Sequence, residues 1–213
     1  MRPLFLTFEG LDGSGKSTHL ARFASLLAAR GVPHRVTHEP GGTPIAQAIR
    51  GVFLDRKHGA MDGIAELLLV FAARRQNLIE VIEPALAAGQ HVLCDRWSDS
   101  TRAYQGFGRG VSQEAIDAID RLATGGRQPD RTLLFDLPPA VARRRGQSGR
   151  RRATRGIDRL DAESLAFYER VRDGYLDLAR REPERFRVID SGGDAALTEA
   201  AVRRALADLT EER

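Results

Sequence analysis

The chain has 213 residues, a length typical of one domain with a complete hydrophobic core. Its single cysteine, Cys94, excludes an internal disulfide, and the sequence shows neither a bilayer-length apolar run nor a signal-peptide pattern. These features argue against membrane proteins and disulfide-stabilised secreted proteins. They predict a single domain, residues 1–213, that works in the cytoplasm without a membrane partner.

Positive charge is concentrated in one short segment. The net charge is +4, but residues 143–155 contain seven arginines and no acidic residue, so the rest of the chain is net negative by three charges. A patch this local suits a polyphosphate ligand better than a nucleic-acid duplex, which needs basic charge along a groove. We therefore expect no nucleic-acid partner, and a solvated basic loop is the alternative explanation.

The first element is a short apolar run that leads into a glycine-rich turn and an amphipathic helix. Residues 10–17 match the phosphate-binding loop pattern G-x-x-x-x-G-K-S. Glycines let successive N–H groups face phosphate oxygens, and the helix that begins near Lys16 adds its positive dipole end. Lys16 is predicted to reach the β- and γ-phosphates of ATP, and Ser17 to bind Mg²⁺. The predicted ATP-binding residues are Gly10, Leu11, Asp12, Gly13, Ser14, Gly15, Lys16, Ser17 and Thr18.

Strands and helices then alternate to the end of the chain. The hydrophobic pattern predicts strands at 4–8, 34–37, 90–95, 132–136 and 187–190. Helices are predicted from 16, from 45 to near 59, and at 61–86, 115–122, 160–181 and 195–209, with a glycine-rich loop at 104–110. This order indicates an α/β fold of the P-loop NTPase type, with three layers and helices on both faces of a five-stranded parallel sheet.

The predicted helix 61–86 is apolar over a wide face in its first half. Such a face suits burial against the chain's own sheet or against a partner, and the pattern alone does not separate the two.

An acidic residue and an arginine follow the third predicted strand. Asp95 stands at the carboxyl end of that strand, where a carboxylate can hold Mg²⁺ beside Ser17. The guanidinium of Arg96 could bind a second phosphate, and the alternative is a structural ion pair between the two residues.

Taken together, four motifs resemble those of the thymidylate kinases, which phosphorylate dTMP from ATP. The resemblance covers nearly the whole chain. It rests on residues 8–18, on Glu39-Pro40-Gly41-Gly42-Thr43, on Asp95-Arg96 with Ser100, Tyr104, Gln105 and Gly106, and on Asp158-Arg159-Leu160-Asp161. It implies transfer of the ATP γ-phosphoryl group to dTMP, giving dTDP and ADP, with Mg²⁺, in a homodimer formed through helix 61–86.

The resemblance also implies roles for single residues. Asp12 would approach the ribose 3′-hydroxyl and the metal, Arg50 and Arg96 would hold the acceptor phosphate, and Arg74 would contact a thymine carbonyl with Phe71 stacking nearby. The expected dTMP-binding residues are Glu39, Pro40, Arg50, Phe71, Arg74, Arg96, Thr101, Tyr104 and Gln105.

Two assignments stay open, as does the identity of the acceptor. In the family, the Phe that stacks on the base lies four residues before the Arg that contacts it. Four residues before Arg74 this chain has Val70, whereas counting four residues on from Phe71 selects Arg75. Arg75 is therefore an alternative to Arg74. The family residue before Glu-Pro-Gly-Gly is usually Arg, and here it is His38. Acceptors such as dUMP or CMP, or a regulatory ATP-binding module, are the competing functions. The second set of arginines, Arg50, Arg74 and Arg96, argues against a regulatory module.

Some thymidylate kinases carry an arginine in the P-loop at the position of Gly13. Without it, positive charge for the transferred phosphoryl group must come from elsewhere. We predict an arginine-rich lid at about 143–156, with glycines at 146, 149 and 156 that let it move. Its central residues Arg150, Arg151 and Arg152 are candidate catalytic residues beside Asp12, Lys16 and Arg96, and Arg155 stays possible.

Overall fold

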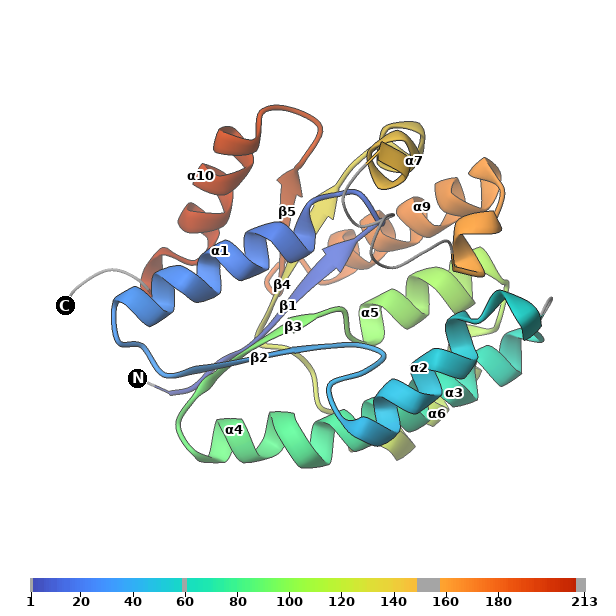
Figure 1. The fold of residues 1–213 in the computed structure, drawn as a ribbon, viewed down its shortest axis with the longest axis horizontal. Helices are drawn as coiled ribbons and strands as arrows, with labels where there is room; N and C mark the ends of the chain where they lie inside the picture. The colour runs from blue at the N-terminus through green and yellow to red at the C-terminus, as the bar shows by residue number, and fades with distance from the viewer. Residues whose placement is uncertain (1, 59–60, 149–157, 210–213) are drawn as a thin grey trace.

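The computed structural model describes residues 2–58, 61–148 and 158–209 and has a central sheet between helical layers (Figure 1). One parallel sheet has the strand order β2-β3-β1-β4-β5. The strands are β1 (Phe5–Gly10), β2 (His34–His38), β3 (His91–Asp95), β4 (Arg131–Asp136) and β5 (Phe186–Asp190). Every residue of β1 is buried, because strands flank it on both sides and helices cover it above and below. The predicted five-stranded parallel sheet is confirmed.

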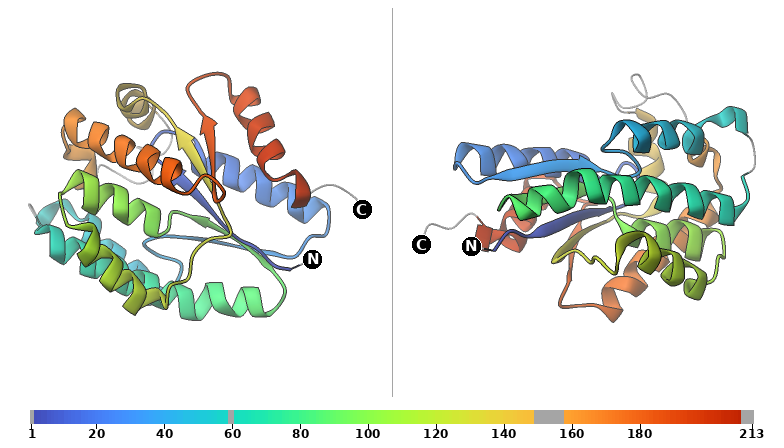
Figure 2. Two further views of the ribbon diagram at one scale, coloured as in Figure 1. Left: turned by 180° about the vertical axis from the view of Figure 1, so that it is seen from behind. Right: turned by 90° about the horizontal axis from the view of Figure 1, so that it is seen from below.

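Different helices cover the two faces of the sheet, as the views from the front and from behind both show (Figures 1 and 2). On one face, α1 (Lys16–Ala29) and α10 (Ala195–Ala205) enclose a core that includes Phe8, Leu27 and Phe135. On the other face, α9 (Leu165–Arg181) packs against β4, and α4 (Glu83–Ala87) packs against β3. In β1, β3, β4 and β5 successive apolar residues contribute to opposite faces, as in Leu133 and Leu134 of β4, which a sheet covered on both faces requires. The edge strand β2 contributes no residue to these cores.

The remaining helices lie near the carboxyl ends of the strands. They are α2 (Pro44–Leu54), α3 (Gly63–Asn77), α5 (Ser98–Thr101), α6 (Gln113–Thr124) and α7 (Pro139–Ser148). Helix α3 packs against both α2 and α6. The side chains of Thr43, Asp62 and Ser112 cap the N-termini of α2, α3 and α6 by accepting backbone N–H bonds. No helix among the described residues is both long and apolar enough to cross a membrane.

The predicted helix 61–86 is one helical run with a change of winding in its middle. Helix α3 continues into a π-helical turn, Leu78–Ile82, which leads into α4. Its wide apolar face is divided: Leu67 and Phe71 are buried within the chain, whereas Ile64 and Leu68 are about half exposed. Burial against the chain's own elements therefore accounts for only part of that face.

The prediction of a loop at 104–110 is wrong, because a π-helix, Arg102–Gly108, continues from α5 there. Its glycines serve close packing rather than a turn. A Cβ atom on Gly106 would lie 2.3 Å from Gln113 Nε2, and one on Gly108 would lie 2.7 Å from the ring of Phe167.

Three further boundaries differ from the prediction. The helix predicted from 45 to near 59 ends at Leu54. Helix α9 begins at Leu165, capped by Ser164, and a 3₁₀ turn at Leu160–Ala162 precedes it. The first three arginines of the predicted lid, residues 143–145, belong to α7. The remainder of that prediction, including Arg150, Arg151, Arg152 and Arg155, lies outside the described residues.

Candidate active site

The segment between β1 and α1 has the backbone conformation of a phosphate-binding loop. Gly10, Gly13 and Gly15 have φ of 133°, 91° and 88°, values that residues with a side chain rarely adopt. Lys16 is buried at the first position of α1, and its Nζ lies 3.1 Å from Asp12 Oδ1. The helix N-terminus and the ammonium group therefore favour an anion at the same place.

Helix α7 lies directly against this loop. A Cβ atom on Gly13 would approach the carbonyl oxygen of Ala142, in α7, to 2.3 Å. Position 13 therefore has no room for a side chain in this arrangement, which agrees with the absence of a P-loop arginine.

Two oxygen groups meet at the ends of neighbouring elements to form a candidate metal site. Ser17 Oγ, in the first turn of α1, donates a hydrogen bond to Asp95 Oδ2 at the end of β3. Hydroxyl and carboxylate oxygens are the hard ligands that Mg²⁺ prefers, usually together with waters and substrate phosphates. The residues present therefore fit a magnesium ion.

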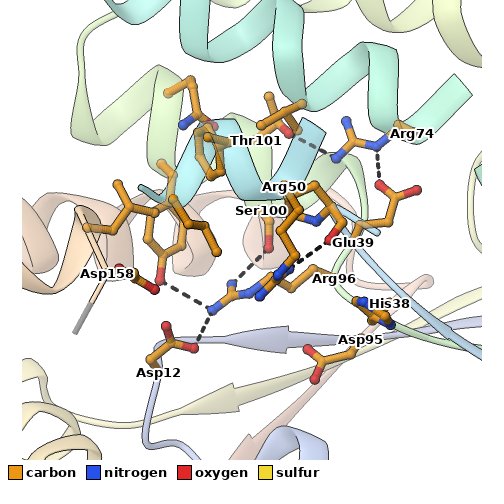
Figure 3. A pocket seen from close by; sticks show the side chains of 17 residues that line it. Asp12, His38, Glu39, Arg50, Arg74, Asp95, Arg96, Ser100, Thr101 and Asp158 are labelled. Carbon is orange, nitrogen blue, oxygen red and sulfur yellow. Dashed lines mark hydrogen bonds and ion pairs between the residues drawn. The ribbon is translucent and has the colours of Figure 1, made fainter. Parts of the chain in front are cut away.

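A cavity of about 430 Å³ opens beside Asp12, among α2, α3 and the α5 region (Figure 3). Its walls contain most of the predicted dTMP-binding residues. The lining residues are Asp12, His38, Glu39, Pro40, Arg50, Phe53, Leu54, Val70, Arg74, Asp95, Arg96, Ser100, Thr101, Tyr104, Gln105, Asp158 and Leu160. Its volume lies within the usual range for a small-molecule site, and its walls combine apolar and charged groups.

Arg96 lies between this cavity and the phosphate-binding loop. It has a positive φ of 76°, the only such value for a residue other than glycine in the described part of the chain. Its Nη2 donates to Asp12 Oδ1 at 2.9 Å, and its Nη1 donates to Ser100 Oγ at 3.0 Å (Figure 3). The residue with this unusual backbone conformation is therefore the one whose guanidinium contacts the loop.

Arg74 and Glu39 form a buried ion pair in the cavity wall. Arg74 Nε donates to Glu39 Oε2 at 2.6 Å, and Arg74 Nη2 donates to Thr101 Oγ1 at 3.0 Å. Burial raises the pKa of Glu39, and the positive charge of Arg74 offsets part of that rise. Arg74 Nη1 is buried and has no hydrogen-bond partner among the described residues.

The structure shows which of Arg74 and Arg75, and which of Val70 and Phe71, lines the cavity. Arg75 points away, and its Nη1 donates to the carbonyl oxygen of Ala123. Phe71 does not line the cavity: it is buried in a small core with Leu67, and the guanidinium carbon of Arg74 lies 4.6 Å from its ring centre. Val70 occupies the wall instead, so the ring-stacking position predicted for Phe71 is corrected.

For several residues that line the cavity, the sequence alone predicts no role in binding. Phe53 and Leu54 end α2, and their carbonyl oxygens accept N–H bonds from Arg159. Arg159 also donates to the fully buried Glu66, which accepts a bond from Gln105 Nε2 at 2.9 Å. The sequence singles out Asp158-Arg159-Leu160-Asp161 as a motif, but these tertiary contacts decide that Asp158 and Leu160 lie in the cavity wall.

Comparisons with known proteins agree with this geometry. The family model for thymidylate kinase matches residues 8–202. A thymidylate kinase of Desulfosudis oleivorans is 50% identical over 195 residues, 91% of each chain. One of Pseudomonas syringae pv. tomato is 46% identical over 212 residues, 99% of this chain and 98% of the other. The crystal structure of thymidylate kinase from Ehrlichia chaffeensis superposes with a TM-score of 0.77 at 31% identity, covering 97% of this chain and all of that one. This chain therefore belongs to the thymidylate kinase family.

Proposed function

We propose that the cavity beside Asp12 holds dTMP as the acceptor for a phosphoryl group from ATP in the phosphate-binding loop. As a family member, the chain transfers the γ-phosphoryl group of ATP to dTMP, giving dTDP and ADP. A phosphate oxygen of dTMP forms the new bond to the γ-phosphorus, and the bond from that phosphorus to the bridging oxygen of ADP breaks. The observation that supports this most directly is Arg96, which lies between the loop and the cavity.

Different arginines would bind the phosphate and the base of dTMP. Arg96 and Arg50 would bind the phosphate of dTMP, since two guanidinium groups can neutralise a dianion whose oxygen must still react. Arg74 would donate its unpaired Nη1 to a thymine carbonyl. Phe71 would act only through Arg74, by supporting the guanidinium against which it packs.

The other polar residues in the wall complete the acceptor site. We propose that Glu39 and Pro40 lie along the nucleotide, and that Thr101, Tyr104 and Gln105 contact its base and sugar. Asp12 would approach the ribose 3′-hydroxyl, a role compatible with its bond to Arg96 at the cavity mouth.

Lys16 would hold the β- and γ-phosphates of ATP, and the loop residues 10–18 would surround them with backbone N–H groups. Ser17 and Asp95 would hold Mg²⁺. When bound, Mg²⁺ would neutralise part of the phosphate charge.

We further propose, from the sequence, that an arginine among residues 150–152 supplies the charge that position 13 cannot. Replacing each with Ala is expected to lower kcat in at least one variant, up to the roughly 10³-fold low end for arginine fingers. The KM for dTMP should change little. Arg180→Ala, on the exposed face of α9, is the control. Unchanged kcat in every variant would remove these arginines from the mechanism.

Two broader proposals accompany this mechanism. We propose that the enzyme is a homodimer that uses the exposed face of α3, and that it works in the cytoplasm. The half-exposed Ile64 and Leu68 support the first proposal. The single cysteine supports the second.

An acceptor panel tests the function. Purified protein with ATP and Mg²⁺ is offered dTMP, dUMP, CMP or thymidine in a coupled assay for ADP release. We expect the highest kcat/KM for dTMP. Faster turnover of CMP or thymidine would contradict the proposed acceptor, and ADP release independent of any acceptor would indicate an ATPase or a regulatory module.

A further inference from the structure

Glu9 is a buried carboxylate beside the acceptor site that the mechanism above does not use. It lies on β1, one residue before the phosphate-binding loop, and has no exposed surface. Its Oε1 accepts the backbone N–H of Trp97 at 2.6 Å. Its Oε2 accepts from Ser100 Oγ at 2.5 Å and from Tyr175 OH at 3.0 Å.

The same two hydroxyl groups also contact Arg96. Arg96 Nη1 lies 3.0 Å from Ser100 Oγ and 3.1 Å from Tyr175 OH. A guanidinium has only donors, so neither hydroxyl hydrogen can point toward it. At 2.7 Å from each other, the hydroxyls can share one hydrogen, and the other then needs a further acceptor. The Glu9 carboxylate is that acceptor, and it leaves hydroxyl lone pairs directed at Arg96.

The backbone bond to Glu9 acts on the same arginine from its other side. Arg96 has a φ of 76°, a strained value for a residue with a side chain. Trp97 is the next residue, and its N–H bond to Glu9 fixes the chain immediately after the strained position. One carboxylate thus holds both the backbone turn and the guanidinium of Arg96.

We propose that Glu9 is a positioning residue for the acceptor phosphate. By accepting from Ser100, Tyr175 and Trp97, it fixes Arg96 Nη1 and leaves Nη2 directed toward Asp12 and the cavity. The inference rests on the proposed role of Arg96. Glu9 itself is fully buried and does not line the cavity.

Glu9→Gln tests the proposal with almost no change of shape. The amide has one acceptor oxygen, so either its NH₂ group faces the N–H of Trp97, or it faces the two hydroxyls that need an acceptor. In either orientation Glu9→Gln loses hydrogen bonds that fix the backbone or the guanidinium of Arg96. We expect the KM for dTMP to rise at least about tenfold, the factor for losing one hydrogen bond to a charged group. The KM for ATP should stay within about twofold.

Asp120→Asn is the matched control. Asp120 is also a buried carboxylate near α5, and it accepts from Ser98 Oγ at 2.8 Å and Arg102 Nη2 at 2.9 Å, but it does not line the cavity. We expect Asp120→Asn to lower thermal stability, because it weakens the bond to Arg102, while leaving the KM for dTMP unchanged. An equal rise of that KM in both variants would show general loosening and overturn the proposal.

Tyr175→Phe removes the hydroxyl group that contacts both Glu9 and Arg96 but leaves the Glu9 carboxylate in place. It also tests the proposal if the Glu9→Gln protein does not fold. It should raise the KM for dTMP several-fold in the wild-type protein and add little in the Glu9→Gln protein, because both changes release Arg96. Full additivity, or an unchanged KM in Tyr175→Phe, would overturn the proposal.

Arg96→Ala separates this inference from the function on which it rests. If Arg96→Ala weakens dTMP but Glu9→Gln does not, only the positioning role fails. If Arg96→Ala leaves the KM for dTMP unchanged, the proposed acceptor role of Arg96 fails, and the role of Glu9 fails with it.

Discussion

At the scale of single residues, the cavity wall contains charges that are buried before any nucleotide arrives. Arg74 and Glu39 each have a side chain only 1% exposed. Desolvating such a pair is costly, and bonds to Thr101 and Asn77 compensate for part of that cost. One Arg74 nitrogen nevertheless has no partner among the residues described. An orphan buried donor is rare in proteins, and we propose that an acceptor atom of the nucleotide is its partner.

Arg74→Lys tests that explanation. Lysine keeps a positive charge beside Glu39 but loses the planar set of donors, so the contact with the base should be lost. We expect the KM for dTMP to rise by about tenfold or more and the KM for ATP to stay unchanged, as measured by steady-state kinetics. Arg75→Lys is the control, because Arg75 points away from the cavity. Matching effects of the two substitutions would argue against a base contact.

Glu9 predicts a pH dependence of stability. Burial, and next the nearby charge of Asp99, raise the pKa of Glu9 to about 7, with Arg96 opposing the shift and the buried Tyr175 hydroxyl from α9 facing the group. Between pH 4.5 and 7 the unfolded chain loses this proton before the folded chain does. The native state then binds more protons, so the free energy of unfolding falls as pH rises through this window.

Glu9→Gln should remove this contribution. Urea unfolding of both proteins at pH 5 and pH 8 measures it, because the other titrating groups cancel in the comparison. We expect the wild-type protein to lose more stability over this range than the variant. Parallel changes in the two proteins would show that the pKa of Glu9 is not raised.

At the scale of elements, glycines explain why the sequence predicts a loop where the structure has a π-helix, Arg102–Gly108. Residues 104–110 contain three glycines, a pattern that usually indicates a loop. In the structure, Gly106 and Gly108 allow the π-helix to approach α6 and α9 closely. The close helix packing in turn places Tyr104 and Gln105 in the cavity wall.

Gly108→Ala should therefore destabilise the fold. Its new methyl group would lie 2.7 Å from the ring of Phe167, and overpacking of this kind costs about 1–3 kcal/mol. Gly51→Ala is a control of opposite sign, because Gly51 is an exposed position in α2 with no atoms near the new methyl group. It should stabilise by about 0.5–1 kcal/mol. Urea unfolding measures both, and a neutral Gly108→Ala would contradict the packing explanation.

Local signals predicted the elements better than the contacts between them. The strands, the phosphate-binding loop and the Asp95-Arg96 motif follow from periodicity and residue type. Val70 and Phe71 show the limit, since both are apolar neighbours on α3 and only the rotation of that helix decides which one lines the cavity. The hydrogen bond that Tyr175 donates to Glu9 joins residues 166 positions apart, and no local pattern predicts such a pair.

At the scale of the whole molecule, helices α2 and α3 pack together (Figure 1). Both helices have exposed apolar side chains. Ile45 and Val52 on α2 are 57% and 45% exposed, and Ile64 and Leu68 on α3 are 45% and 53% exposed. Ile64 and Leu68 are four residues apart, so they lie on the same side of their helix. Single exposed apolar residues are common, but a group on adjoining helices suits a protein interface.

Leu68→Glu tests the proposed homodimer. A charge placed in an apolar interface would be desolvated without a partner, so the variant should be monomeric at concentrations where the wild-type protein is a dimer. Analytical ultracentrifugation measures the mass of each. Leu122→Glu is the control: Leu122 is 84% exposed on α6, outside the proposed interface, and its substitution should leave the mass unchanged. A monomeric wild-type protein, or a Leu68→Glu variant that remains dimeric, would exclude the exposed face of α3 as the dimer contact.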